Sequence, residues 1–364
     1  LMGAELPWRE PAPLMRAALY WPGLTQPSLA DLRARWQPGR PVVAVVFYRA
    51  LFQAGNLRVV DGLIDALAAQ RINALPIATF SLKEDVAAAI VRELIAEAAP
   101  DVVLNATGFA VSRPGAERTE TPFDAVDAPV FQVVFAGGTE EQWRDRTNGL
   151  SARDIAMNVA LPEVDGRVLS RAVSFKGNAR WHAATQCWIT EYTPVPDRLA
   201  YVAELATRWA RLRRTPPRDK RVAIVLANYP NRDGRLANGV GLDTPAGVAN
   251  AVERLAAEGY DVGDAPRDGR SLMNRLTAGP TNAPDTAGER SGDVRLSLTG
   301  YRAFFESLPE TVRTRVIERW GAPEADPFVA GDTFVLPAHR FGNLVIAVQP
   351  ARGYNIDPVE SYHD

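Results

Sequence analysis

Polar side chains are concentrated between residues 228 and 243, in the stretch NYPNRDGRLANGVGLD. A guanidinium group pairs with a carboxylate through two parallel hydrogen bonds, amides donate and accept, and a tyrosine ring stacks on flat molecules. The glycines at 234, 239 and 241 let a ligand approach the backbone closely. The candidate binding residues in this stretch are Asn228, Tyr229, Asn231, Arg232, Arg235, Asn238 and Asp243.

A second polar stretch, QPARGYNIDP at 349–358, offers the same chemistry of guanidinium, amide and tyrosine ring. Its candidate binding residues are Gln349, Arg352, Tyr354 and Asn355. The alternative interpretation of both stretches is a pair of solvated loops without a partner. In that case each arginine forms a surface ion pair, which contributes little to stability.

The chain has three histidines, and two of them, His339 and His363, flank the last apolar run. A neutral imidazole is both a common metal ligand and a base near neutral pH, so these two are weak metal-binding candidates. For each of them an ordinary surface or hydrogen-bonded histidine is the alternative. His182 is a poorer candidate, and the single cysteine, Cys187, is expected to be a small buried residue.

The common catalytic signatures are missing from the sequence. It contains no G-x-x-x-x-G-K-[ST] phosphate loop, no H-E-x-x-H, no paired C-x-x-C and no G-x-S-x-G. ATP hydrolysis by a phosphate loop is therefore not expected in this chain. The binding stretches remain the best candidates for a functional site.

Strand and helix patterns surround the first polar stretch. Val222–Ala227 is an apolar run suited to one buried parallel strand. Thr244 is the expected N-cap of the following helix, and Pro245 suits its first turn. Because ligands of open parallel sheets bind at the carboxyl ends of strands, this edge is the predicted site. The run Gly342–Gln349 predicts a second strand that leads into QPARGYNIDP in the same way.

Length and composition indicate an ordinary globular protein of two domains. The chain has 364 residues, 46% of them hydrophobic, and a net charge of −2, which gives no hint of nucleic-acid binding. One cysteine fits a reducing cytoplasm, and no apolar run of membrane-spanning length is present. Both ends look cut, so we expect a fragment of a longer protein.

Alternating strand and helix patterns predict the fold class. An N-terminal arm, 1–38, precedes a flavodoxin-like doubly wound α/β domain at 39–212, then a linker at 213–220 and the start of a second α/β domain at 221–364, incomplete at its C-terminus. Within the first domain, Ile155–Leu161 and Val168–Val173 are expected to pair as a hairpin, and Asp197–Arg214 to form its C-terminal helix. Residues 180–193 are expected to be irregular, and 279–297 to form a surface loop.

Four motifs carry a resemblance to one family across essentially the whole chain. They are RPVVAVVFYRALFQAGNLRVVDGLIDAL at 40–67, LPEVDGRVLSRAVSFK at 161–176, LANYPNRDGRLANGVGLDTPA at 226–246 and GNLVIAVQPARGYNIDP at 342–358. The sequence resembles the CobN family, the large subunits of ATP-dependent aerobic cobaltochelatase, and more loosely the related H subunits of magnesium chelatase. The third and fourth motifs are the most specific.

The resemblance implies a ligase that forms nitrogen–metal bonds and inserts cobalt(II), as substrate, into hydrogenobyrinic acid a,c-diamide during cobalamin biosynthesis. It implies that separate AAA+-type subunits use ATP and Mg. In the family, the stretch suspected of metal insertion follows QPARGYNIDP. The catalytic residues are therefore expected beyond residue 364, and the fragment alone is expected to be inactive.

Two other functions remain open on the sequence. One is the magnesium chelatase H subunit, which would act on magnesium and protoporphyrin IX. The other is a non-catalytic, two-domain α/β protein that closes on a small polar ligand, because fold does not determine function. A preference for protoporphyrin would favour the first, and compaction with sugars or amino acids the second.

Overall fold

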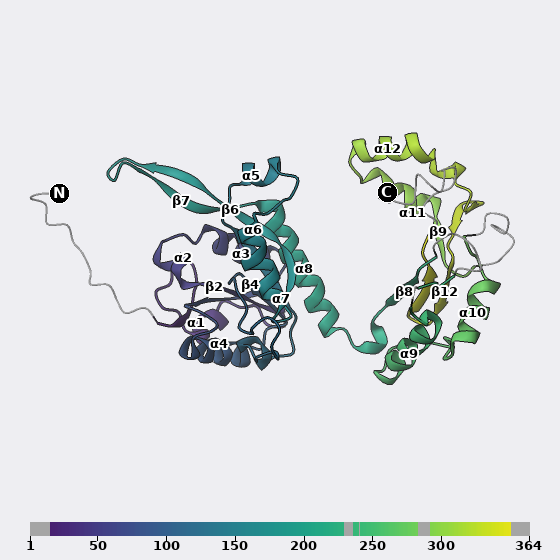
Figure 1. The fold of residues 1–364 in the computed structure, drawn as a ribbon, viewed down its shortest axis with the longest axis horizontal. Coiled ribbons are helices and arrows are strands. Elements are labelled where there is room, and N and C mark those ends of the chain that lie inside the picture. The colour runs from purple at the N-terminus through teal and green to yellow at the C-terminus, as the bar shows by residue number, and fades with distance from the viewer. Residues whose placement is uncertain (1–14, 229–235, 240, 283–291, 351–364) are drawn as a thin grey trace, which may run out of the picture. The chain divides into compact units, whose positions relative to one another are not determined.

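The computed structural model describes residues 15–228, 236–239, 241–282 and 292–350, and it is shown in Figure 1. The chain divides into two compact units, Leu1–Arg214 and Thr215–Asp364, called here the first and second unit. Over the described ranges, every helix is too short or too polar to cross a bilayer.

The first unit contains a seven-stranded sheet. Its strands are β1 (Ala17–Leu19), β2 (Val42–Tyr48), β3 (Asn73–Thr79), β4 (Val102–Asn105), β5 (Val130–Ala136), β6 (Val168–His182) and β7 (Cys187–Pro194). Their spatial order is β1-β3-β2-β4-β5-β6-β7; the five central strands are parallel, and β1 and β7 are antiparallel at the edges. The parallel strands follow the flavodoxin-like order 2-1-3-4-5, so the predicted α/β class is confirmed.

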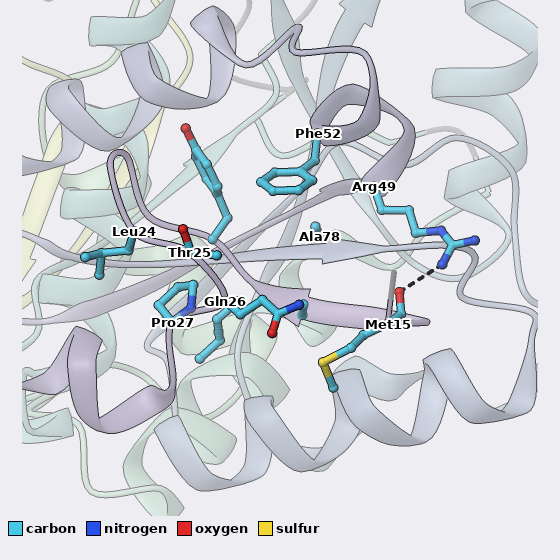
Figure 2. A pocket seen from close by; sticks show the side chains of 11 residues that line it. Met15, Leu24, Thr25, Gln26, Pro27, Arg49, Phe52 and Ala78 are labelled. Atoms are coloured by element: carbon cyan, nitrogen blue, oxygen red, sulfur yellow. Dashed lines mark hydrogen bonds between the residues drawn. The ribbon is translucent and has the colours of Figure 1, made fainter. Parts of the chain in front are cut away.

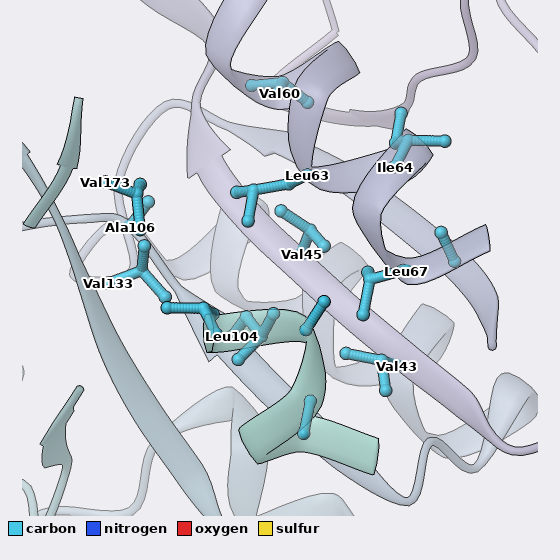
Figure 3. Packing of buried hydrophobic residues seen from close by; sticks show 14 of the residues in the cluster. Val43, Val45, Val60, Leu63, Ile64, Leu67, Leu104, Ala106, Val133 and Val173 are labelled. Atoms are coloured by element: carbon cyan, nitrogen blue, oxygen red, sulfur yellow. The ribbon is translucent and has the colours of Figure 1, made fainter. Parts of the chain in front are cut away.

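Helices cover both faces of this sheet. They are α1 (Leu29–Arg33), α2 (Arg49–Gln53), α3 (Arg58–Ala69), α4 (Asp85–Ala98), α5 (Glu140–Asp145) and α8 (Pro196–Arg214). The core beneath α3 and α8 includes Leu63 and Leu67 of α3, which face Val43 and Val45 of β2 (Figure 3). A second core lies beneath α1 and α4. The apolar residues of α3 recur at helical spacing, which is why that helix buries one face.

The predicted hairpin between Ile155–Leu161 and Val168–Val173 is wrong. Residues 152–163 are helical, as α6 (Ala152–Ile155), a π-helical turn (Ala156–Ala160) and α7 (Leu161–Glu163). Ser151 caps this segment, because its hydroxyl accepts a hydrogen bond from the Asp154 N–H at 3.1 Å. Pro162 cannot donate to the carbonyl of Asn158, and its ring would collide there, which accounts for the wider turn. The prediction failed because the apolar pattern of residues 155–161 is short and is compatible with both a strand and a helix.

The hairpin of the first unit is instead formed by β6 and β7, and it projects from the sheet (Figure 1). Residues 180–193, expected to be irregular, belong largely to these two strands. Trp181 and Trp188 pack edge to face there, with centroids 5.8 Å apart, and both stay about half exposed. Cys187 is exposed rather than buried, and it lies at the start of β7.

The second unit is built on a mixed sheet of three strands in the order β12-β13-β8. These are β8 (Val222–Leu226), β12 (Ala338–Phe341) and β13 (Leu344–Val348), packed on α9 (Thr244–Ala257) and α10 (Gly269–Ala278). The expectation that 222–227 forms a buried parallel strand is wrong in part. Strand β8 is parallel to β13, but in the described residues it lies at the sheet edge, and Val225 is 60% exposed.

A smaller three-stranded sheet accompanies two further helices in the second unit. It consists of β9 (Arg295–Ser297), β10 (Val329–Ala330) and β11 (Thr333–Val335), beside α11 (Leu298–Glu306) and α12 (Glu310–Trp320). The predicted surface loop at 279–297 is wrong in part. Thr281 and Asn282 are buried, at 4% exposure each, and the segment ends in β9.

Candidate functional site

The two predicted binding stretches begin side by side. Strands β8 and β13 are parallel neighbours, with Leu226 opposite Val348, the last residue of β13. The Gln349 N–H donates to the Leu226 carbonyl at 2.7 Å, which extends the pairing one residue further. The chain therefore leaves both strands at the same edge of the sheet, where ligands of parallel sheets bind.

Asn228 is the most informative of the described candidates. It forms an antiparallel bridge with Leu236, and the Ala237 N–H donates to the Ala227 carbonyl at 2.9 Å, so the two ends of the intervening segment meet. The Asn228 side chain is buried at 2% exposure, and its amide nitrogen and oxygen have no hydrogen-bond partner among the described residues. An unpaired buried amide costs about 1–3 kcal/mol, which a polar ligand group would recover.

The other described candidates differ in their surroundings. Asp243, rather than Thr244 as predicted, is the N-cap of α9, and its carboxylate accepts from the Ala246 N–H at 3.1 Å. Asn238 is exposed. The Gln349 carbonyl accepts from the side-chain amide of Asn282 at 2.7 Å. Asn282 was not predicted, because it comes from a stretch whose composition is that of a surface loop.

Eight of the predicted residues lie outside the described residues. They are Tyr229, Asn231, Arg232, Arg235, Arg352, Tyr354, Asn355 and His363. The binding role of both stretches therefore stays a prediction.

His339 lies on β12 opposite Ile346, two residues before the end of β13. Its imidazole is buried at 5% exposure, and its Nδ1 atom lies 3.7 Å from a carboxylate oxygen of Asp293. Among the described residues, its buried Nε2 atom has no partner at good hydrogen-bond geometry. Burial lowers the pKa of His339 below 6.5, the nearby Asp293 carboxylate opposes that shift, and the Arg275 charge adds to it. His339 is therefore a neutral base at pH 7.

A cavity of about 320 Å³ adjoins this histidine. Its walls are Arg275, Ala278, Gly279, Gly292, Asp293 and His339. Within the described residues, no group of three His, Cys, Asp or Glu side chains is placed to hold a metal ion. The pair His339–Asp293 can act as a base or supply one metal ligand. No sequence signal marked Asp293, because it lies 46 positions from His339 along the chain.

An apolar cavity of about 300 Å³ lies beside β1 in the first unit (Figure 2). Phe52, Leu24 and Pro27 line it, and the Arg49 guanidinium at its rim donates to the Met15 carbonyl at 2.9 Å. Hydrogen-bonding groups are sparse in its lining, so its chemistry suits an apolar group rather than a polar substrate.

Comparisons with known proteins agree with the motifs. The family model described as CobN/Magnesium Chelatase matches residues 1–364. The chain is 50% identical to the aerobic cobaltochelatase subunit CobN of Sinorhizobium sp and 43% identical to that of Pseudomonas aeruginosa, over 99% and 100% of this chain. It is 27% identical to the magnesium-chelatase H subunit of Chlorobaculum parvum, over 88% of this chain.

A solved structure gives the same result. The catalytic subunit of cobaltochelatase from Mycobacterium tuberculosis matches 99% of this chain with a TM-score of 0.73 and 30% sequence identity. The chain spans 29% of the length of that subunit and of both CobN relatives, and 24% of the magnesium-chelatase relative. The predicted resemblance is therefore confirmed, and the chain belongs to the CobN/magnesium chelatase family.

Proposed function

We propose that the chain is part of the tetrapyrrole-binding subunit of an aerobic cobaltochelatase. The reaction would insert cobalt(II), a substrate, into hydrogenobyrinic acid a,c-diamide in cobalamin biosynthesis, with formation of nitrogen–metal bonds. The observation that carries the proposal is the 50% identity to a CobN subunit over 99% of the chain, against 27% to a magnesium-chelatase H subunit. That difference favours cobalt and a corrin precursor over magnesium and protoporphyrin IX.

We place part of the ring-binding surface at the carboxyl ends of β8 and β13. A corrin precursor is a broad apolar ring surrounded by carboxylates and amides. The unpaired amide of Asn228 would answer a ring amide, and Arg232 and Arg352 would pair with ring carboxylates. The adjacency of the two strand ends supports this assignment, because one ligand could then touch both stretches.

In this proposal, ATP hydrolysis and catalysis are carried out by partner subunits and by other segments of the longer subunit. ATP, with Mg, would be hydrolysed by AAA+-type subunits, since the sequence has no phosphate loop. Catalytic residues would come from the rest of the longer subunit, of which the relatives have about 71% outside the matched part. His339 would then be a base or a single metal ligand, and the complex would work in the cytoplasm.

Calorimetric titration of hydrogenobyrinic acid a,c-diamide into the chain tests the binding surface. Asn228→Leu should weaken binding about tenfold, because a charged or amide partner is lost, and should raise the stability of the ligand-free chain by removing an unpaired polar group. Asn250→Leu is the matched control, since the same change is made at an exposed position of α9 outside the two binding stretches, and it should leave affinity unchanged.

The same titration with Arg232→Ala and Arg352→Ala tests the two arginines. A titration of protoporphyrin IX into the unchanged chain tests the choice of ring. Tighter binding of protoporphyrin IX would overturn the cobalt assignment. Binding of sugars or amino acids, with none of either tetrapyrrole, would instead support a small-ligand-binding protein.

A further inference from the structure

A third cavity, which lies in the first unit, has none of the predicted binding residues in its lining. It measures about 540 Å³ and opens where β2, β4 and β5 end, at Tyr48, Ala106 and Gly137. The chain runs from β2 to β3 on one side, whereas β4 lies on the other side of β2. This edge is therefore the point where the direction of winding reverses, which is the usual ligand crevice of doubly wound sheets.

Aromatic rings form much of the cavity wall. Tyr48, Phe109, Phe135 and Tyr192 all line it, and the rings of Phe135 and Tyr192 lie 5.9 Å apart. Phe109 is 44% exposed, so a large apolar ring is left partly bare at the opening. Such walls favour a flat ligand that stacks or packs edge to face.

The charge that this cavity presents is positive. The one carboxylate in its lining, Asp154, already accepts from the Gly137 N–H at 3.0 Å, the Ser151 hydroxyl at 2.7 Å and the Asn158 amide at 3.4 Å. Arg153 and Lys176 are exposed, and neither forms an ion pair with any described residue. The Lys176 ammonium lies 6.0 Å from the centroid of the Tyr192 ring, a cation–π contact that leaves its charge without an anionic partner. Two such cations beside a carboxylate that already accepts three hydrogen bonds leave room for an anion.

The loop that carries Phe109 is strained and firmly held. Phe109 has a φ of 63°, an unusual and strained conformation for an aromatic residue. Its N–H donates to the Met157 carbonyl at 2.8 Å, and the Tyr48 hydroxyl donates to the Gly108 carbonyl at 3.1 Å. Met157 belongs to the π-helical turn, a feature frequent at functional sites. Because these hydrogen bonds hold the strained loop in place, the site is preformed.

We propose that this cavity binds a planar aromatic molecule bearing a phosphate or a carboxylate. The ring packs on Phe109 and Tyr192, and the anionic group pairs with Arg153 and Lys176. Every residue that forms this site belongs to the first unit, whereas β8 and β13 belong to the second.

Two fluorescent probes test the proposal on the 364-residue chain. Flavin mononucleotide carries a phosphate on a planar ring system, and coproporphyrin III carries carboxylates. Saturable binding of flavin mononucleotide, with riboflavin at least about tenfold weaker, identifies a phosphate ligand, because riboflavin lacks only that anion. Saturable binding of coproporphyrin III alone identifies a carboxylate ligand. Binding of neither probe overturns the proposal.

Variants locate the bound probe. Arg153→Gln/Lys176→Gln should weaken the probe that binds by about tenfold or more, since two charge-assisted contacts are lost. Arg208→Gln/Arg213→Gln removes the same charge from exposed positions of α8 and should leave affinity unchanged. Phe109→Gly permits the positive φ without strain but removes the ring, and it should also weaken binding. Equal affinity of wild type and both cavity variants would refute this site.

Discussion

His339 illustrates how the surroundings of one side chain define its chemistry. Its imidazole is buried, and its Nε2 atom lies so close to Gly279 that a Cβ atom on that glycine would overlap the ring. Glycine at 279 is therefore required by close approach rather than by backbone conformation.

Gly279→Ala should destabilise the second unit by about 1–3 kcal/mol, because the added methyl group overpacks the histidine. Gly247→Ala is the matched control: Gly247 lies inside α9 with no atom within 4 Å of the added Cβ, and this change should stabilise by about 0.5–1 kcal/mol. Denaturant unfolding measures both. The double variant Gly279→Ala/His339→Ala should cost less than the sum of the single changes, and strict additivity would contradict the overlap.

The pH dependence of stability should also report on His339. Its folded-state pKa is below 6.5, so the unfolded state binds more protons near that pH, and the stabilising contribution present above 6.5 is lost as pH falls below it. Thermal unfolding at about pH 7.5 and about pH 5.5 should therefore show a larger loss for wild type than for His339→Gln. Identical losses in the two proteins would show that His339 titrates normally.

At the scale of elements, a buried ion pair fixes the connection between the helical segment 152–163 and β6. Asp165 and Arg167 are 1% and 2% exposed in their side chains and lie 2.6 Å apart. The Asp165 carboxylate also accepts from the N–H groups of Val111 and Ser112, at 2.8 and 2.9 Å. The pair thereby joins the loop after β4, which carries Phe109, to the start of β6.

Asp165→Asn should destabilise the first unit by about 3–5 kcal/mol, because the Arg167 charge would remain buried without its counterion. The control is Glu140→Gln, which breaks the exposed Arg144–Glu140 pair and should cost less than about 1 kcal/mol. Calorimetric unfolding distinguishes the two. A similarly small effect at Asp165 would mean that solvent reaches the pair.

Prediction from sequence succeeded where one element carries its own periodic signal. The apolar spacing of α3 and the uninterrupted apolar run of β2 each specify their elements without reference to the rest of the chain. It failed at 155–161, where the pattern is too short to distinguish periods, and at 281–282, where polar residues are buried by distant partners. The cavity at the ends of β2, β4 and β5 could not be predicted, because its walls come from several separate segments of the sequence.

At the scale of the whole molecule, each unit has hydrophobic cores made only of its own residues. Leu63→Ala should destabilise the first unit by about 2–5 kcal/mol, and Leu276→Ala should do the same to the second, because both side chains are almost fully buried. Hydrogen exchange should accelerate in β2 and β4 with the first change and in β8 and β13 with the second. Equal acceleration in both units after either change would contradict this assignment.

The projecting β6–β7 hairpin has a practical consequence for experiments on this protein. The sequence contains a single cysteine, and that residue is exposed at the start of β7. A maleimide dye or spin label would therefore attach at one known point of the unmodified chain, without mutagenesis. That label would report changes in the surroundings of the hairpin.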